Sequence, residues 1–171
     1  TCICPGGMMN MVTSDIMEAC GIRLPDAHKD AGQMAALAKT VYETGCFENV
    51  GVPFCMTVEA EGMGAPSDLG SSTIEPRVTG YVIRSVSEYT NLTPLDLTRG
   101  RCRTVLEALS ILKSSCPTLP VIGNLTGPIS TASSLIEPMV FYRELRKKKE
   151  EAHAFLDFVT GELLRYGLAQ I

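Results

Sequence analysis

Residues 49–56 read NVGVPFCM and residues 119–128 read LPVIGNLTGP, two short apolar runs that each lead into a loop. A run of the same kind, TCICPGG at residues 1–7, opens the chain. Short apolar runs bounded by Gly, Pro and Asn are typical of strands that are buried on both faces. Strands of this kind predict a parallel sheet covered by helices.

The segments between these runs carry helical patterns. Residues 13–21 begin at a Thr or Ser cap and end at Gly21, and Asp30 with Gln33 forms a pair that resembles a capping box. The other expected elements are a helix through residues 35–45, a helical turn at 58–64, a short edge hairpin within 72–83, an amphipathic helix at 99–116, a helix at 130–145 interrupted near Pro138, and a last helix at 150–171 with Phe155, Phe158, Val159, Leu163 and Tyr166 on one face.

The order of elements is therefore β-α-β-α-β-α, and the loops that follow the strands fall on one edge, where α/β folds place their sites. The chain ends on a helix after 171 residues, whereas an eight-stranded barrel needs about 250. We expect residues 1–171 to form the N-terminal half of a (β/α)8 TIM-type barrel, an α/β domain of parallel strands and covering helices, with the C-terminal half absent.

The composition excludes several classes of protein. Hydrophobic residues make up 45% and charged residues 20%, a composition that excludes a disordered chain. The net charge of −4 does not provide the excess of positive charge that is typical of nucleic-acid-binding proteins. The basic run at 143–149 precedes Glu150 and Glu151 and is expected to be a solvated helix face. No run is long enough to span a membrane, and no signal peptide opens the chain. Seven scattered cysteines favour a reduced, cytoplasmic protein with mostly buried thiols.

Some candidate motifs have a simpler structural explanation. No second Cys or His pair stands near Cys2 and Cys4 at a suitable spacing, so core cysteines are favoured over zinc ligands. Glu59 and Glu61 diverge by about 200° on a helical turn, which argues against a paired-carboxylate site. Glu59 is the better candidate for a polar contact with substrate or for support of a metal ligand.

The two histidines, His28 in DAHKD and His153 beside charged residues, are both expected at the surface. The loop residues are the stronger site candidates. Gly6 and Gly7 either form a tight turn or allow a large ligand to approach the backbone. The site candidates that line the expected rim are Gly6, Gly7, Met8, Asn10, Cys55, Glu59, Asn124, Thr126 and Ser134.

Three of these site candidates have a competing structural role: packing for Met8 and Cys55, and helix capping for Asn10. No histidine is placed to activate Cys55 as a nucleophile. Asn124 and Thr126 follow the third expected strand, at the edge that forms the catalytic rim of a barrel, and we expect at least one of them to contact substrate.

Several segments, in the same order, resemble the uroporphyrinogen decarboxylase superfamily. They are CPGGMMN at 4–10, GCFENVGVPFCMTVEAEGMGA at 45–65, IEPRV at 74–78, VIGNLTGPISTASSLIEPM at 121–139 and HAFLDFVTGELLRYGLAQI at 153–171. More narrowly, they look like its branch of corrinoid-dependent methyltransferases, of the methylcobamide:coenzyme M type. The resemblance implies a (β/α)8 barrel of about twice this length.

The resemblance also separates the two branches of the family. Decarboxylases grip a polycarboxylate substrate with two arginines, whose positions fall at Gly6 and Asn10, and no arginine occurs in CPGGMMNMVTSD. Their aspartate after the second strand corresponds to Cys55, and their tyrosine after the third strand corresponds to Ser134. The methyltransferase branch is therefore favoured.

In that branch, the resemblance implies methyl transfer from a methylcobalamin-type corrinoid on a corrinoid protein to a small thiol such as coenzyme M. A zinc ion activates the thiol, and its His-x-Cys and later Cys ligands are expected beyond residue 171, because neither His28 nor His153 is followed by x-Cys. Two alternatives stay open: a decarboxylase-like lyase with an altered substrate, and a catalytically inactive fragment. As a fragment, the chain is expected to form a homo-oligomer through its uncovered apolar faces.

Overall fold

The computed structural model describes residues 12–45 and 47–171. At its centre, strands β1 (Val50–Val52) and β4 (Val121–Gly123) pair in parallel, with Val50 opposite Val121 and Val52 opposite Gly123. The parallel pairing predicted from the two apolar runs is thereby confirmed. The strand expected at residues 1–7 lies outside the described residues, as do the candidates Gly6, Gly7, Met8 and Asn10.

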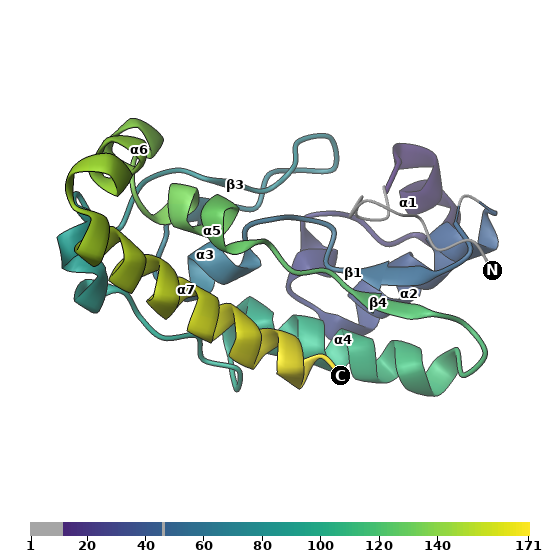
Figure 1. The fold of residues 1–171 in the computed structure, drawn as a ribbon. Helices are drawn as coiled ribbons and strands as arrows, with labels where there is room; N and C mark the ends of the chain where they lie inside the picture. The colour runs from purple at the N-terminus through teal and green to yellow at the C-terminus, as the bar shows by residue number, and fades with distance from the viewer. Residues whose placement is uncertain (1–11, 46) are drawn as a thin grey trace.

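Helices and turns fill the remaining chain in the expected order (Figure 1). The elements besides β1 and β4 are α1 (Ser14–Cys20), η1 (Asp26–His28), α2 (Ala31–Glu43), α3 (Val58–Gly62), β2 (Ser67–Asp68), β3 (Arg77–Val78), η2 (Val86–Asn91), α4 (Gly100–Ser115), α5 (Pro128–Leu135), α6 (Pro138–Lys147) and α7 (Lys149–Ala169).

The local signals for the ends of α2 are confirmed. Asp30 is the N-cap, and its Oδ1 accepts a hydrogen bond of 2.8 Å from the backbone N–H of Gln33. After α2, Gly45 takes a φ of +76°, a left-handed conformation that glycine adopts without strain and that stops the helix. This helix packs on both α4 and β1.

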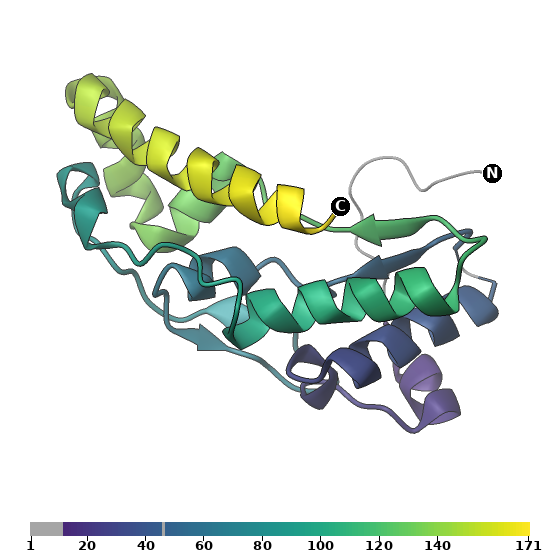
Figure 2. The same cartoon turned by 90° about the horizontal axis from the view of Figure 1, so that it is seen from below.

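The helices α2 and α4 lie together against the β1–β4 pair, whereas α7 packs on α5, α6 and η2 (Figure 2). All three residues of β1 are buried, but Val121 and Ile122 of β4 are only half-buried and Gly123 is exposed. The prediction that this strand is buried is wrong for this chain, because among the described residues β4 pairs with β1 alone.

The expected hairpin is present, but its first strand lies before the predicted range. Strands β2 and β3 pair antiparallel, and Arg77 bonds Asp68 across them at 2.9 Å. The interruption near Pro138 is confirmed, since α5 ends at Leu135 and α6 begins at Pro138. The hairpin and the α5–α6 junction both lie on the side of the molecule where the carboxyl ends of β1 and β4 are found (Figure 1).

The apolar face of the last helix is confirmed in α7. Phe155, Val159, Leu163 and Tyr166 are buried, and the half-buried Phe158 contacts Tyr89 with ring centroids 6.2 Å apart. The outer face of the same helix carries exposed Leu164 and Leu168.

The described thiols and charges follow the sequence-based predictions. Cys55, Cys102 and Cys116 are buried and free, and Cys20 is half-buried. Most of the basic run at 143–149 is solvent-exposed, as expected of a solvated face. In the part of the chain that the structure describes, no helix is both long and apolar enough to cross a membrane.

Candidate functional site

The loops that follow β1 and β4 start side by side. The backbone N–H of Asn124 donates to the Val52 carbonyl at 2.8 Å, and its side-chain Nδ2 donates to the Pro53 carbonyl at 3.3 Å. Because the strands are parallel, these loops leave the sheet at the same edge. The predicted rim residues of the second and third strands are therefore neighbours.

The short helix α3 links this edge to two other elements through its two glutamates. Glu59 Oε1 accepts a 2.9 Å hydrogen bond from the backbone N–H of Thr126, in the loop after β4. Glu61 points elsewhere, and its Oε2 accepts from Arg101 Nη1 of α4 at 2.7 Å. The predicted divergence of the two carboxylates is confirmed, and each has a separate neighbour.

Glu59 is a deeply buried carboxyl group, with 1% of its surface exposed. Burial raises the pKa of Glu59, while the hydrogen bonds from Thr126 and the positive charge of Arg101 work against that rise. Its second oxygen, Oε2, has no hydrogen-bond partner among the described residues. The group therefore ties α3 to the loop after β4 from inside the protein.

Arg101 is a residue that the sequence reasoning missed. Its side chain is 6% exposed, and its guanidinium donates to Glu61, to the Thr57 hydroxyl at 3.0 Å and to Cys55 Sγ. Burial opposes its charge, but Cys55 and Glu61 outweigh burial and raise the pKa of Arg101. A signal was available, since Arg101 repeats at helical spacing with buried Val105, Ala108 and Leu112.

Cys55 lies in this network and not on an open surface. It is buried, and it accepts hydrogen bonds from Arg101 and, at 3.7 Å, from the Thr57 hydroxyl. Nearby on α4, burial raises the pKa of the Cys102 thiol to about 12, so that thiol stays protonated near neutral pH. The cluster of Cys55, Thr57, Glu61 and Arg101 thus fixes the β1–α3 loop to α4.

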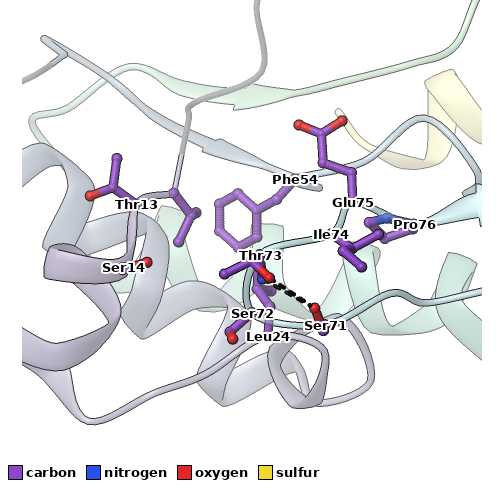
Figure 3. A pocket seen from close by; sticks show the side chains of 11 residues that line it. Thr13, Ser14, Leu24, Phe54, Ser71, Ser72, Thr73, Ile74, Glu75 and Pro76 are labelled. Carbon is purple, nitrogen blue, oxygen red and sulfur yellow. Dashed lines mark hydrogen bonds between the residues drawn. The ribbon is translucent and has the colours of Figure 1, made fainter.

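A cavity of about 410 Å³ opens beside the end of β1 (Figure 3). The Phe54 ring projects toward the β2–β3 loop, in which the hydroxyls of Ser71 and Thr73 are 3.3 Å apart. The volume of the cavity is in the range of small-molecule sites, and the walls of the cavity carry both apolar and hydroxyl groups. The cavity is lined by Val12, Thr13, Ser14, Leu24, Phe54, Ser71, Ser72, Thr73, Ile74, Glu75 and Pro76.

The predicted site residues fall into three groups. Asn124, Thr126, Cys55 and Glu59 are brought together around the ends of β1 and β4. Ser134 is not part of that cluster: its hydroxyl bonds the Ser130 carbonyl within α5, and it lines a separate depression beside β3. The four candidates of the first loop lie outside the described residues.

The prediction that His28 lies at the surface is wrong. Its polar neighbours Asp26, Lys29 and Asp30 are exposed, but the 3₁₀ turn directs Ala27 and His28 into the core, where His28 has no exposed surface. Burial, aided by the charge of Arg101, lowers the pKa of His28 to about 4. His153 is exposed on α7, as predicted.

Within residues 12–45 and 47–171, no group of three or more His, Cys, Asp or Glu side chains is placed to hold a metal ion.

Comparison with known proteins was made at the level of family, sequence and structure. The family model described as uroporphyrinogen decarboxylase (URO-D) matches residues 1–171. The chain is 34% identical over 160 residues to the methylcobamide:CoM methyltransferase MtbA of Methanosarcina acetivorans, covering 93% of this chain and 47% of that protein. It is 32% identical over 158 residues to MtaA of Methanosarcina barkeri, also a methylcobamide:CoM methyltransferase, covering 92% and 47%.

A solved structure of a methyltransferase from Methanosarcina mazei superposes with a TM-score of 0.88 at 30% identity. The match covers 98% of this chain and 50% of that one. The chain thus spans about half the length of the curated relatives and of the solved structure that it matches.

Proposed function

The chain belongs to the uroporphyrinogen decarboxylase family, and on that premise we propose that it is part of a methyltransferase that moves a methyl group from a methylated corrinoid to a thiol such as coenzyme M. The observation that carries this proposal is the 34% identity to a methylcobamide:CoM methyltransferase over 93% of the chain. The proposal concerns the whole protein, of which residues 1–171 supply one part.

The charges near the strand ends support methyl transfer over decarboxylation. A polycarboxylate substrate requires cationic groups that are free to bind it, and residues 4–15 contain no arginine. Arg101 does lie close to β1, but both terminal nitrogens of its guanidinium are engaged by Glu61, Thr57 and Cys55.

In the proposed enzyme, residues 1–171 shape the rim that receives the two reactants. We propose that Gly6, Gly7, Met8 and Asn10 contribute to the first rim loop, and Asn124 follows β4 at the third. The cavity beside Phe54 has the volume of a small-molecule site and would hold a small reactant such as the thiol. Zinc, bound by ligands outside residues 1–171, would supply Lewis-acid activation of that thiol.

We further propose that residues 1–171 form the N-terminal half of a barrel domain, that a corrinoid protein is the methyl donor, and that the enzyme works in the cytoplasm. The half-length match to a solved methyltransferase supports the first point. Produced alone, residues 1–171 are expected to self-associate, because Leu164 and Leu168 are 62% and 71% exposed on α7. A monomeric mass by light scattering would contradict this expectation.

The direct test uses the full-length protein with methylcobalamin as donor and coenzyme M as acceptor. Loss of methylcobalamin absorbance and formation of methyl-coenzyme M by mass spectrometry are expected, with both abolished by a zinc chelator and restored by zinc. A parallel incubation with uroporphyrinogen is expected to release no carbon dioxide. Decarboxylation without methyl transfer would support the lyase alternative, and absence of both activities would support an inactive protein.

A further inference from the structure

Helix α6 carries two large apolar side chains and three cations on one exposed face. The side chain of Met139 is 75% exposed and that of Tyr142 is 51% exposed. The exposed residues of this face follow the i, i+3, i+4, i+7, i+8 spacing of one side of a helix and form the α6 stripe: Met139, Tyr142, Arg143, Arg146 and Lys147. The same five residues line a surface depression of about 510 Å³.

The three cations of the α6 stripe form no ion pair with any carboxylate that the structure describes. The two glutamates beside them are engaged elsewhere. Glu137 caps α6 and accepts from the Val140 N–H at 2.7 Å, and Glu144 pairs with Lys148 at 3.1 Å. The stripe therefore presents positive charge to solvent on a chain whose net charge is −4.

The opposite face of α6 fixes the orientation of the stripe. Phe141 is fully buried and meets Phe155 of α7 edge-on, with ring centroids 5.7 Å apart. Glu144 is 7% exposed, and its Oε2 accepts from the Ser85 hydroxyl at 3.0 Å and from the Val86 N–H at 2.9 Å. Because a surface that is already ordered loses less conformational freedom on association, this face is suited to docking.

The position of α6 relates the stripe to the candidate site. The helix lies on the side of the molecule where the carboxyl ends of β1 and β4 are found (Figure 1 and Figure 2). Reactants of parallel α/β proteins bind at that side of the sheet. A macromolecule that delivers a reactant to the site would therefore approach from the side that carries the stripe.

The composition of the stripe selects a protein as its partner. Tyr, Met and Arg are enriched in the cores of protein interfaces, and Tyr and Arg are frequent among the residues that dominate binding. A membrane-surface helix needs a broad apolar face, whereas the inward side of α6 buries Phe141 and leaves only Met139 and Tyr142 outside. The three cations require that the partner surface be acidic.

We propose that the α6 stripe is the docking surface for the corrinoid protein that donates the methyl group, and that it binds an acidic surface of that protein. The cations attract and orient the donor, and Met139 and Tyr142 pack against apolar side chains at the centre of the contact. The identity of the partner rests on the proposed function, whereas the location and charge of the stripe do not.

The test compares two methyl donors with the full-length protein: free methylcobalamin, and a purified corrinoid protein that carries methylcobalamin. Arg146→Glu places a negative charge opposite the acidic surface, and the KM for the corrinoid protein is expected to rise about tenfold at low salt. The kinetics with free methylcobalamin are expected to stay at the wild-type values. In about 1 M salt, which screens charges beyond about 3 Å, the rise is expected to shrink below about threefold.

Tyr142→Ala tests the apolar part of the same contact. Loss of a buried aromatic side chain from an interface is expected to raise the KM for the corrinoid protein about tenfold. Because this contribution is not a charge interaction, the rise is expected to persist at high salt. Free methylcobalamin is again expected to react as with the wild type.

Lys113→Glu is the matched control, since it makes the same change of charge on an exposed residue. Lys113 lies in the last turn of α4, before β4 begins, and therefore near the amino end of that strand. This variant is expected to leave the KM for the corrinoid protein within about threefold of the wild type. If Lys113→Glu raised that KM as much as Arg146→Glu does, the net charge of the protein would be responsible and the proposal would be overturned.

Other outcomes assign the stripe to a different occupant or to none. Unchanged KM in Arg146→Glu, or an equal loss of activity with both donors, would overturn the proposal. A lower melting temperature of full-length Arg146→Glu would show that the stripe packs against the rest of the chain. Binding of the wild type to phosphatidylglycerol vesicles that Arg146→Glu abolishes would assign the stripe to a membrane surface, and both results would overturn docking of the donor.

The two donors also separate this proposal from the proposed function. Transfer from free methylcobalamin, with no binding of the corrinoid protein by calorimetric titration, would leave the function in place and overturn the docking surface. Absence of transfer from either donor would reject the proposed function. The titration would then still decide whether the stripe binds the corrinoid protein, through the difference between the wild type and Arg146→Glu.

Discussion

Replacing Arg101 by methionine tests whether the buried guanidinium holds the β1–α3 loop on α4. Methionine keeps a long apolar side chain in a site where Arg101 is 6% exposed, but it removes every donor. Glu61, Thr57 and Cys55 then lose their shared partner. The variant therefore isolates the polar contribution from the packing of the side chain.

The expected loss follows from the exposure of each partner. Removing one member of a fully buried ion pair costs about 3–5 kcal/mol. Glu61 is 33% exposed, so water can solvate its freed carboxylate, which reduces the ion-pair share to about 1–2 kcal/mol. Thr57 is 5% exposed, and its lost hydrogen bond adds about 1 kcal/mol. Together these give a decrease of about 2–3 kcal/mol in the free energy of unfolding.

Urea denaturation followed by circular dichroism measures this decrease. Arg103→Met is the control, because Arg103 pairs with Glu107 on the solvent side of the same helix, where the side chains are 57% and 48% exposed. That variant is expected to lose less than about 0.5 kcal/mol. Equal losses for Arg101→Met and Arg103→Met would refute the inference that Arg101 organises the loop.

Three further changes test other features of the fold. Burial lowers the pKa of His28 from 6.5 to about 4, so the unfolded chain binds a proton at a higher pH than the folded protein does, and stability is lost as pH falls from 6.5 to 4. Replacing His28 by leucine is expected to remove up to about 3 kcal/mol of this acid sensitivity, measured as the difference between urea titrations at pH 7.5 and 4.5. With the pKa of Cys102 raised to about 12 by burial, iodoacetamide at pH 8 is expected to label the half-buried Cys20 before Cys102, and fast labelling of Cys102 in the folded protein would contradict its burial. Gly62→Ala would place a Cβ 2.6 Å from a buried leucine side chain and is expected to lower the melting temperature, whereas Gly161→Ala, with no atom within 4 Å, is expected to gain about 0.5–1 kcal/mol.

Features set by neighbouring residues were predictable from sequence. The Asp30 cap, the glycine stop after α2 and the apolar runs that form β1 and β4 all follow from short-range patterns. The break before Pro138 follows in the same way, because proline cannot continue a helix without losing a hydrogen bond.

Features that depend on tertiary neighbours were not predictable. His28 lies among polar residues, and only the fold of η1 against α2 explains why it is buried. The half-exposed state of β4 depends on how many strands flank it and not on its own residues. At the site, sequence pointed to Glu59 and Thr126 separately, but their bond joins residues 67 positions apart, a distance over which periodicity carries no information.

The two glutamates of α3 place different constraints on how this sequence can change. Glu61 is matched to the side chain of Arg101, so positions 61 and 101 can be exchanged together, for instance as a reversed ion pair or as two apolar residues. Glu59 is matched to a main-chain N–H, which among substitutions of its partner only proline removes, so position 59 is confined to a side chain of this length with an acceptor at its end. Covariation is therefore expected between positions 61 and 101, whereas position 59 is expected to alternate only between Glu and Gln.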